Sequence, residues 1–472
     1  MMRTVHSVLV ALLAVMVTTA GCAVARAGLQ RERVDLVIQG GTVLTMDADW
    51  SSFHDGFVAV RGDRIVAVGE RRALAPRFLA RQTIDARDKA VLPGLINGHT
   101  HAPMVLFRGI ADDLDLQQWL TEYIFPAEAK NVTRQFVRWG TRLACVEMIR
   151  GGTTTFADMY YFEDEIAAVA AAAGMRGVLG QTVIDFPSPD SRTPDAALEY
   201  AARFINQYRH HPLIVPAIAP HAPYTLSTET LKKVQSFAET HDVPVLMHVA
   251  ETQTEIDDVS QRFGARPVLY LQRIGLLTPR LIAAHAVHLT DEEIALLKRH
   301  QVGVVHNPQS NMKLASGIAP VPRLLRADVA VGLGTDGAAS NNTLDMFEAM
   351  KTTALLHKVA SADPKVVSAR QALAMATING ARALHLDREI GSLQPGKRAD
   401  IIVVDLNAPH QVPVYDLYSQ LVYATDATDV NTVIINGRVV MSNRRLLTLD
   451  QPTIIAKAQE FRRTILQSLQ AK

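Results

Sequence analysis

The stretch AVLPGLINGHTH (residues 90–101) decides the fold class, because two kinds of sequence pattern meet in it. It begins as an apolar run, typical of a buried strand, and ends in two histidines separated by one threonine. Residues two apart on a strand point to the same side, so His99 and His101 could face one metal ion. The pair alone is a weak signal, because two histidines often fall this close by chance.

Beyond this stretch, apolar strand-like runs alternate with helix-like segments up to residue 385. Such alternation predicts a parallel sheet, and eight runs over residues 93–385 predict a (β/α)8 barrel, a TIM-type α/β fold. A doubly wound open sheet is the alternative. The seven runs that follow the first cover residues 152–159, 175–184, 213–224, 243–251, 281–289, 302–310 and 329–337.

Strand-rich sequence flanks the predicted barrel on both sides. Residues 34–92 and 386–448 alternate apolar and polar residues around Gly-Gly, Gly-Asp and Asn-Gly pairs, which is the pattern of β-hairpins. The simplest interpretation is one small β-sandwich domain built from both ends of the chain. Residues 449–472 are expected to form a C-terminal helix.

Composition narrows the class of protein. The chain has 472 residues with 48% hydrophobic and 20% charged residues, as in ordinary globular proteins. Its formal net charge is +1, so we expect no nucleic acid partner. Two cysteines, Cys22 and Cys145, cannot build a disulfide framework.

Residues 1–27 have the layout of a secretory signal: Arg3, an apolar run (residues 8–17) and then small residues. The apolar run is about half the roughly 20 residues that a membrane-spanning helix needs. The sequence TAGC (residues 19–22) also resembles a bacterial lipoprotein signal, in which Cys22 would be lipidated and anchor the protein to a membrane. Export to the periplasm or to a membrane surface is therefore expected. Ordinary cleavage stays open, because Thr19 replaces the usual aliphatic residue, and a spurious signal would leave the protein in the cytoplasm.

Polar residues follow the apolar runs at their C-terminal ends. In a barrel these ends meet at one mouth, where active sites lie. Taken singly, His248 could be a satisfied core residue and Asp336 could cap the next helix. Together with His99 and His101 they form a set of four nitrogen and oxygen donors, which suits zinc, with iron as a second choice.

Two more residues at these ends are candidates for proton transfer. Glu251 lies three residues after His248, and a carboxylate beside a metal-activated water can carry protons. His285 ends another run and is predicted to be functional, whereas His288 is predicted to hold a loop.

At these residues the sequence resembles the amidohydrolase superfamily, in particular its 5-methylthioadenosine/S-adenosylhomocysteine deaminase branch, which lies near the triazine chlorohydrolases. The resemblance covers nearly all of the chain after residue 33. It rests on the ordered motifs PGLINGHTH, RGIADDLDLQQWL, PHAPYT, HVAET, AAHAVHLT, HNPQSNMKLASGIAPV and GTDGAASNNTLD.

The resemblance implies one zinc ion bound by His99, His101, His248 and Asp336. It also implies hydrolytic deamination of an adenosine-type nucleoside to the inosine-type product and ammonia. In that reaction Asp336 takes a proton from the attacking water, His285 orients the water, and Glu251 protonates the ring nitrogen next to purine C6. Relatives with two metals use a carboxylated lysine, and the matching strand ends here contain none.

The resemblance further implies residues that bind the substrate. Glu128 matches a glutamate that holds ribose hydroxyls, although a Glu in a helix is more commonly solvated. His221 matches a histidine near the substrate or caps a strand, and Trp119 lines the pocket or anchors a helix. Gln181 stands where such deaminases commonly carry an arginine that would pair with a substrate carboxylate. This departure disfavours S-adenosylhomocysteine unless Arg192 compensates.

Two alternatives remain at this stage. The chain could have another amidohydrolase activity, such as a triazine-like chlorohydrolase or a deaminase of another base, but Glu128 favours a nucleoside. It could also be a scaffold that has lost catalysis, which the intact Glu251, His285 and Asp336 disfavour. Relatives imply a homo-oligomer.

Overall fold

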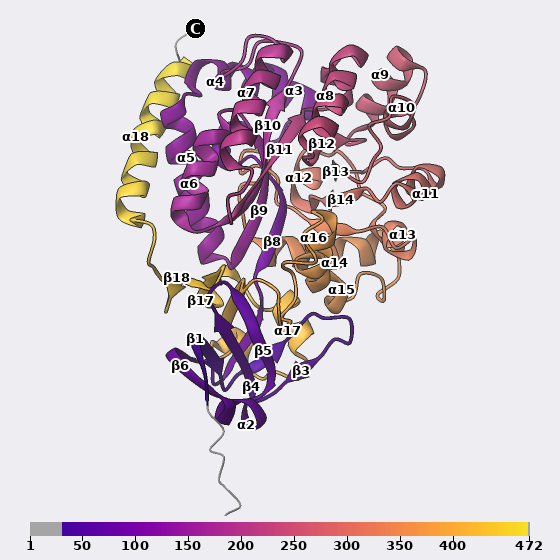
Figure 1. The fold of residues 1–472 in the computed structure, drawn as a ribbon. Coiled ribbons are helices and arrows are strands. Elements are labelled where there is room, and N and C mark those ends of the chain that lie inside the picture. Colours follow the sequence, from indigo (N-terminus) through magenta and orange to yellow (C-terminus); the bar gives the residue numbers. More distant parts are fainter. Residues whose placement is uncertain (1–30, 471–472) are drawn as a thin grey trace, which may run out of the picture.

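Eight parallel strands pair in chain order around a barrel in the computed structural model, which describes residues 31–470 (Figure 1). β8, β9 and β10 are buried along their whole length, which explains why these runs are continuously apolar. The predicted barrel is therefore confirmed. Its strands are β8 (Leu95–Thr100), β9 (Thr153–Tyr160), β10 (Arg176–Val183), β11 (Ile214–Pro220), β12 (Val245–Val249), β13 (Leu281–His285), β14 (Gly303–His306) and β15 (Val331–Leu333).

Side-chain and backbone bonds close the seam between the first and last barrel strands. Past the end of β15, the backbone N–H of Asp336 donates to the His99 carbonyl at 2.9 Å. The buried Asn97 side chain accepts from the Thr335 N–H at 3.0 Å and donates to its hydroxyl at 2.7 Å. Gly334 permits the close approach, because a Cβ there would lie 2.9 Å from the His99 backbone nitrogen. The seam thus fixes one strand end against another at the barrel mouth.

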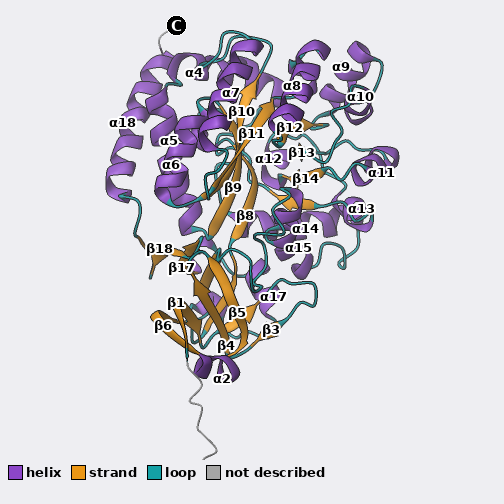
Figure 2. Cartoon of the chain, in the orientation of Figure 1, coloured by secondary structure: helices purple, strands orange, loops and turns teal. Residues whose placement is uncertain are grey.

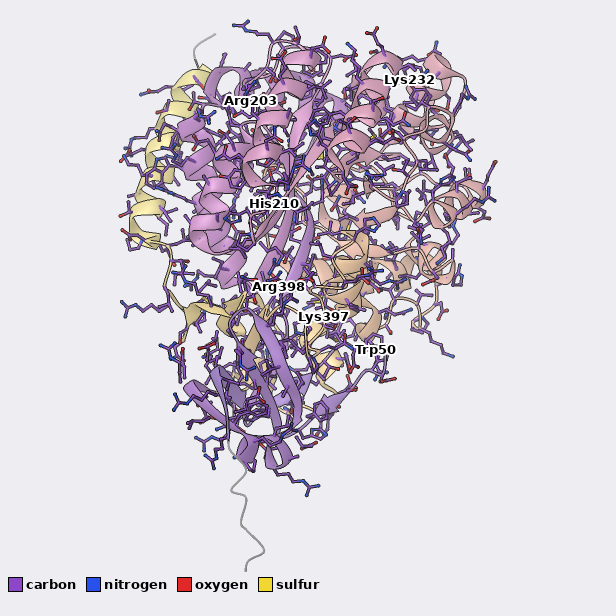
Figure 3. The ribbon with its side chains drawn as sticks, in the orientation of Figure 1. Trp50, Arg203, His210, Lys232, Lys397 and Arg398 are labelled. Carbon is purple, nitrogen blue, oxygen red and sulfur yellow. The ribbon has the colours of Figure 1, made fainter. Side chains whose placement is uncertain are left out.

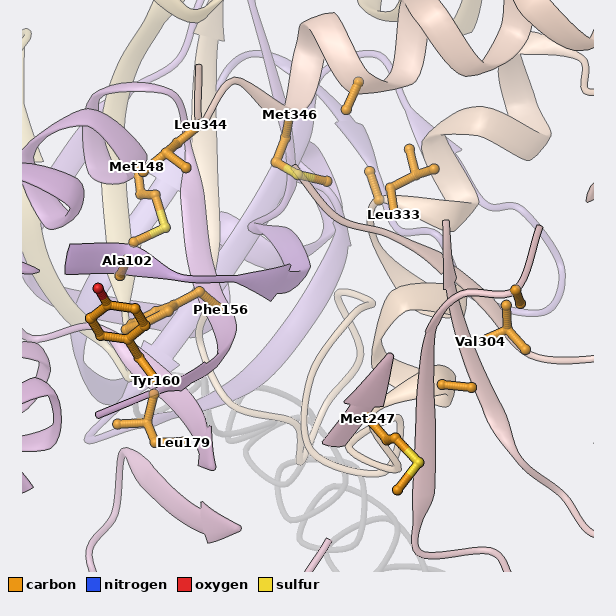
Figure 4. Packing of buried hydrophobic residues seen from close by; sticks show 14 of the residues in the cluster. Ala102, Met148, Phe156, Tyr160, Leu179, Met247, Val304, Leu333, Leu344 and Met346 are labelled. Carbon is orange, nitrogen blue, oxygen red and sulfur yellow. The ribbon is translucent and has the colours of Figure 1, made fainter. Parts of the chain in front are cut away.

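The barrel has an inner and an outer apolar layer. Ile96, Val178, Leu246, Ile282 and Val305 form one buried cluster although their strands lie around the whole barrel, so they meet in its interior. A larger cluster packs the outer faces of the strands against the helices, and Figure 4 shows its members Phe156, Leu179, Met247, Val304 and Leu333.

Helices surround the strands (Figure 2), and many begin at a side chain that accepts from the first turn. Thr133, Thr193, Ser227, Thr252 and Thr290 cap α5, α7, α8, α9 and α11 in this way. The longer helices are α5 (Arg134–Arg150), α6 (Glu163–Ala173), α7 (Pro194–Tyr208), α8 (Thr228–His241), α9 (Gln253–Phe263), α11 (Asp291–Arg299) and α14 (Met346–Ser361). The shorter ones are α10 (Pro267–Arg273), α12 (Pro308–Lys313), α13 (Val321–Arg326), α15 (Ala369–Met375), α16 (Ile378–Ala383) and α17 (Leu417–Tyr423).

The connection after β8 carries several short helical segments toward the barrel mouth. These are the 3-10 helix η2 (Ala102–Phe107), α3 (Leu116–Gln118), the π-helical turn η3 (Trp119–Ile124) and α4 (Phe125–Asn131). The remaining short segments are α2 (Arg71–Leu74), η1 (Ala75–Arg77), η4 (Pro223–Thr225), η5 (Pro409–Gln411) and η6 (Ala427–Asp429).

A smaller β-domain contains segments from both ends of the chain, as predicted. Leu36, Val58, Val91, Ile401 and Ile434 belong to one buried cluster, so its two sheets share a core. The first sheet has the order β5 (Arg64–Glu70), β4 (Gly56–Arg61), β1 (Glu32–Gln39) and β6 (Phe78–Asp85). The second has the order β19 (Arg445–Leu446), β18 (Arg438–Ser442), β17 (Val430–Ile435), β16 (Ile401–Asp405), β7 (Lys89–Pro93), β2 (Thr42–Leu44) and β3 (Ser52–Phe53).

A buried ion pair joins the β-domain to the barrel, and a half-buried pair joins the two ends of the chain within the β-domain. Arg176, the first residue of β10, bonds the carboxylate of Asp400 through two nitrogens, at 2.8 and 3.1 Å. Arg398, labelled in Figure 3, pairs with Asp63 in the turn between β4 and β5. Breaking a buried pair of this kind is costly because it leaves a charge without a partner.

The C-terminal helix α18 (Gln451–Gln470) runs along the outer face of the barrel (yellow in Figure 1). Phe461 packs edge-on against Phe136 of α5 at 5.9 Å, and Asn131 donates to the Ser468 hydroxyl at 2.8 Å. Within residues 31–470, no helix combines the length and the apolar character needed to cross a membrane. The predicted signal and Cys22 lie outside the described residues.

Asn97→Ala should lower the stability of the barrel, because it removes both hydrogen bonds between Asn97 and Thr335 and leaves the buried Thr335 N–H without its partner. We expect the free energy of unfolding to fall by about 1–3 kcal/mol, the cost of leaving a buried donor unsatisfied. Urea denaturation measures this, with the exposed helix residue substitution Asn206→Ala as the control. Equal stability of the two variants would show that the seam does not depend on Asn97.

Candidate metal centre and cavity

Four side chains converge at the barrel mouth, as the sequence predicted for metal ligands. His101 Nε2 lies 3.3 Å from His248 Nε2 and 3.2 Å from Asp336 Oδ1. His99 Nε2, which is buried and makes no hydrogen bond with the described residues, lies 3.4 Å from the same Asp336 oxygen. One ring nitrogen each of His99, His101 and His248 falls within 4.8 Å of the others. Donor atoms this close, one of them without a partner, fit a single metal ion.

The second ring nitrogen of two of these histidines is held by the backbone. His101 Nδ1 bonds the Met159 carbonyl at 2.6 Å, and His248 Nδ1 bonds the His221 carbonyl at 2.8 Å. A carbonyl only accepts, so each Nδ1 carries the proton and each Nε2 can offer a lone pair to a metal.

The pKa values of the ligands follow from burial and from Asp336. Burial lowers the pKa of His99 to about 4 and holds that of His248 well below its usual range, so both rings are neutral. Burial also acts on His101, but its bond with Asp336 raises its pKa to about 9. Burial alone would raise the pKa of Asp336, yet the His101 and His99 rings hold it well below the ordinary value. Metal binding would displace the proton between His101 and Asp336.

Asp336 is fixed by its own backbone and by two serines. Its φ is +62°, in the left-handed region that non-glycine residues seldom adopt. The hydroxyls of Ser310 and Ser340 donate to Oδ2 at 2.6 and 3.0 Å, and the Gly337 N–H donates to Oδ1 at 2.7 Å. A non-glycine residue held in this region of backbone conformation is a common feature of functional sites.

Glu251 and His285 lie beside the metal ligands. His285 Nε2 is 3.7 Å from Glu251 Oε2 and 4.0 Å from Asp336 Oδ2. The side-chain amide oxygen of Asn311 accepts from His285 Nδ1 at 2.8 Å, so Nε2 faces the two carboxyl groups. Burial raises the pKa of Glu251 and so favours its protonated form.

A second glutamate, which the sequence reasoning missed, holds the turn that presents Glu251. The buried Glu255 carboxyl group accepts from the N–H of Ala250 at 2.8 Å and of Glu251 at 2.7 Å. Ala250 has a φ of +55°, so the chain turns sharply where β12 ends. The signal for Glu255 was present in the sequence, because Thr252 and Glu255 have the T-x-x-E spacing of a helix start.

The cavity beside the metal ligands has mostly apolar walls. Trp119, Glu128 and His221 all line it, as the resemblance implied. Among the described residues that line it, none is a lysine or an arginine. The lining comprises His101, Met104, Leu116, Trp119, Leu120, Ile124, Phe125, Glu128, Met159, Tyr160, Tyr161, Thr182, His221, Tyr224, His248, Glu251, His285, Leu314 and Asp336.

The predicted substrate residues in the cavity differ in how they are held. The Trp119 indole N–H is buried and has no partner among the described residues. His221 Nδ1 lies 3.1 Å from the Thr225 hydroxyl, and burial lowers the pKa of this ring to about 3. Burial raises the pKa of Glu128 to about 7, against the effect of a hydrogen bond from Tyr160.

Gln181 is not among the residues that line the cavity. Its side chain donates to Asp190 at 2.7 Å and accepts from the Glu163 N–H at 3.3 Å. Gln181 therefore links the loop that contains Asp190 to the start of α6, outside the cavity. The next residue, Thr182, faces the cavity instead, because side chains alternate along a strand. Arg192 is exposed and also does not line the cavity. His288 donates to the Ser316 carbonyl at 2.7 Å and so holds a loop.

The chain is similar in sequence and in structure to several known proteins. Residues 90–440 match the model of the amidohydrolase family. A 5-methylthioadenosine/S-adenosylhomocysteine deaminase of Syntrophobacter fumaroxidans is 51% identical over 433 residues, covering 92% of this chain and 99% of that protein. An adenosine deaminase of Xanthomonas campestris with bound zinc superposes with a TM-score of 0.91 at 41% identity, covering 93% of this chain and 100% of that one. Atrazine chlorohydrolase from Arthrobacter aurescens, complexed with zinc, has a TM-score of 0.84 at 26% identity, covering 90% and 100%.

Glu255 should make stability depend on pH in a defined direction. Burial raises its pKa from 4.5 to about 8, so the folded protein holds a proton there that the unfolded chain releases. Its contribution to stability is therefore fully present below about pH 4.5 and is lost as pH rises through about 8. Glu255→Gln mimics the protonated form and removes this titration.

The measurement is urea denaturation of both proteins at pH 6 and pH 8.5. The unfolding free energy of the wild type, relative to Glu255→Gln, should be lower at pH 8.5 than at pH 6. Glu199→Gln, on an exposed position of α7, should show no such change. An unchanged difference between pH 6 and pH 8.5 would mean that Glu255 is already ionised in the folded protein at pH 6.

Proposed function

The chain belongs to the amidohydrolase family, and we propose that it is a zinc-dependent deaminase of adenosine-type nucleosides. Its substrate is 5-methylthioadenosine, S-adenosylhomocysteine or adenosine, and its products are the inosine-type nucleoside and ammonia. One observation carries the proposal: a single cavity joins the metal-ligand cluster to the buried carboxyl groups of Glu251 and Glu128.

The cofactor is one zinc ion per subunit, held by His99, His101, His248 and Asp336. Three imidazoles and a carboxylate are donors that zinc prefers, and Fe²⁺ is the second choice. The unpartnered Nε2 of His99 supports this assignment. Zinc held by these four residues would lower the pKa of a water molecule and so would supply hydroxide near neutral pH.

The chain's own residues supply the proton transfers. Asp336, whose pKa is held low, accepts a proton from the attacking water. His285 orients that water by accepting a hydrogen bond at Nε2. Glu251, whose pKa burial raises, delivers a proton to the ring nitrogen adjacent to purine C6, and the amine leaves as ammonia.

Glu128 supports a nucleoside over a free base or a triazine. Its buried carboxyl group faces a cavity whose described lining contains no lysine or arginine, so a ligand can supply hydrogen-bond donors beyond the hydroxyls of Tyr160 and Tyr161. The two hydroxyls of a ribose are such donors. Further polar groups in the cavity lining come from His221, Trp119 and Thr182. Gln181 does not line the cavity and bonds Asp190 instead.

Glu251→Gln should lower the kcat for adenosine by about 100-fold or more, because general acid–base groups contribute at least that much. Zinc content should stay at one ion per chain. Absorbance changes follow turnover of adenosine, 5-methylthioadenosine, S-adenosylhomocysteine, guanine, cytosine and a chlorotriazine. Glu292→Gln, on the exposed face of α11, is the matched control.

The outcomes separate the candidate functions. If the zinc-loaded wild type converts no adenosine derivative, the proposal is wrong, and turnover of the chlorotriazine alone would assign a triazine hydrolase. Loss of zinc from Glu251→Gln would make Glu251 a metal ligand rather than the acid.

We also propose that the protein is exported and anchored through lipidated Cys22, and that it is a homo-oligomer. The support for export is the pattern of residues 1–27. The support for an oligomer is the exposed apolar loop with Val412, Val414 and Tyr415, and sedimentation equilibrium tests it.

Cys22→Ala tests the anchor in a bacterial host. The full chain should incorporate labelled palmitate and fractionate with membranes, and Cys22→Ala should lose both properties. Wild-type protein that is cleaved but carries no label would indicate an ordinary signal peptide, and unprocessed cytoplasmic protein would indicate a spurious signal.

A further inference from the structure

Tyr160 and Tyr161 are consecutive residues at the end of β9, and both hydroxyls reach one buried carboxylate. The Tyr160 hydroxyl donates to Glu128 Oε1 at 2.7 Å, and the Tyr161 hydroxyl donates to Oε2 at 3.5 Å. Their ring centroids lie 4.8 Å apart. Neighbouring residues on a strand would normally point to opposite sides. Here Tyr161 follows the last strand residue, and Phe162 turns the chain with a φ of +55°.

The environment of Glu128 makes these two hydroxyls important. Glu128 is 4% exposed, and the described cavity lining contains no lysine or arginine that could pair with it. A buried carboxylate without such a partner needs hydrogen-bond donors to remain oriented. Burial keeps the pKa of both tyrosines well above 10, so both hydroxyls act as donors.

With both tyrosine hydroxyls bound, the Glu128 carboxylate can still accept hydrogen bonds from a ligand. A carboxylate offers about four lone-pair sites on two oxygens, and the tyrosines use one on each oxygen. The remaining sites can accept two further donors, such as the vicinal hydroxyls of a ribose. The Tyr160 ring is itself fixed, because it packs in the buried cluster near Phe156 and Leu179 (Figure 4).

We propose that Tyr160, assisted by Tyr161, is a positioning residue that orients Glu128 to bind both ribose hydroxyls, which makes the site selective for ribonucleosides. The inference rests on the proposed function and adds to it the source of ribose selectivity. Tyr160 acts through Glu128 and does not touch the reacting atoms.

The test compares the wild type with Tyr160→Phe, which removes one hydroxyl and keeps the ring. Zinc-loaded enzymes are assayed with adenosine and with 2′,3′-dideoxyadenosine, which has no ribose hydroxyls. For adenosine, kcat/KM should fall roughly tenfold or more through KM, as expected for a lost bond to a charged group. For the dideoxynucleoside, the two enzymes should differ by less than about twofold.

Two further variants calibrate the result. Tyr161→Phe removes the longer bond and should raise the KM for adenosine less than Tyr160→Phe does. Tyr418→Phe removes another buried hydroxyl, from α17, that has no partner among the described residues, and should leave both substrates unaffected. Zinc content and the thermal unfolding midpoint of each variant show whether it folds. If Tyr160→Phe does not fold, the same comparison is made with Tyr161→Phe alone.

Calorimetric binding of inosine and 2′,3′-dideoxyinosine gives a readout that does not need turnover. Weaker binding of inosine alone by Tyr160→Phe supports the proposal. Equal losses for both ligands, or no loss for either, overturn it. If the wild type binds inosine but converts no adenosine derivative, the proposed function fails while the role of Tyr160 is still decided. If it neither binds nor converts any nucleoside, both are overturned.

Discussion

The whole site depends on the meeting of parallel strand ends at one rim, and on the seam that closes the rim. The Asp336 N–H donates to the His99 carbonyl, so the last proposed metal ligand in the chain is tied directly to the first. Asn97 and Gly334 make that contact possible, one by bonding Thr335 and the other by having no Cβ. Because the first and last strands are fixed here, the four proposed metal ligands, which come from distant parts of the sequence, can face one ion.

Burial and neighbouring side chains give two carboxyl groups of the site opposite shifts in pKa. Asp336 and Glu251 are both buried carboxyl groups near His285, yet the pKa of Asp336 is lowered and that of Glu251 is raised. The difference arises because two ligand histidines contact Asp336, whereas Glu251 has only a long hydroxyl contact and a distant ring. One group therefore accepts a proton and the other donates one, which is the arrangement that hydrolytic deamination requires.

Sequence reasoning recovered the barrel, the two-ended β-domain and the residues that converge at its mouth, because each depends on local pattern. Apolar runs of strand length and polar residues at their ends can be read one segment at a time. Sequence reasoning missed Glu255 and Tyr160, because their roles depend on hydrogen bonds that form only in the folded protein. Glu255 bonds the backbone that presents Glu251, and Tyr160 bonds Glu128. Sequence reasoning also expected Gln181 at the substrate, whereas the strand presents Thr182 to the cavity and turns Gln181 toward Asp190.

The sequence by itself therefore determined the order of the elements and the set of chemical groups at the strand ends. Side-chain period and turn residues encode those features over a few neighbouring positions. Only the tertiary structure decided which nitrogen of each histidine faces the centre, which carboxyl group holds a proton, and which glutamate braces another. These properties are set by burial and by contacts between residues far apart in the chain, and such contacts exist only once the barrel closes.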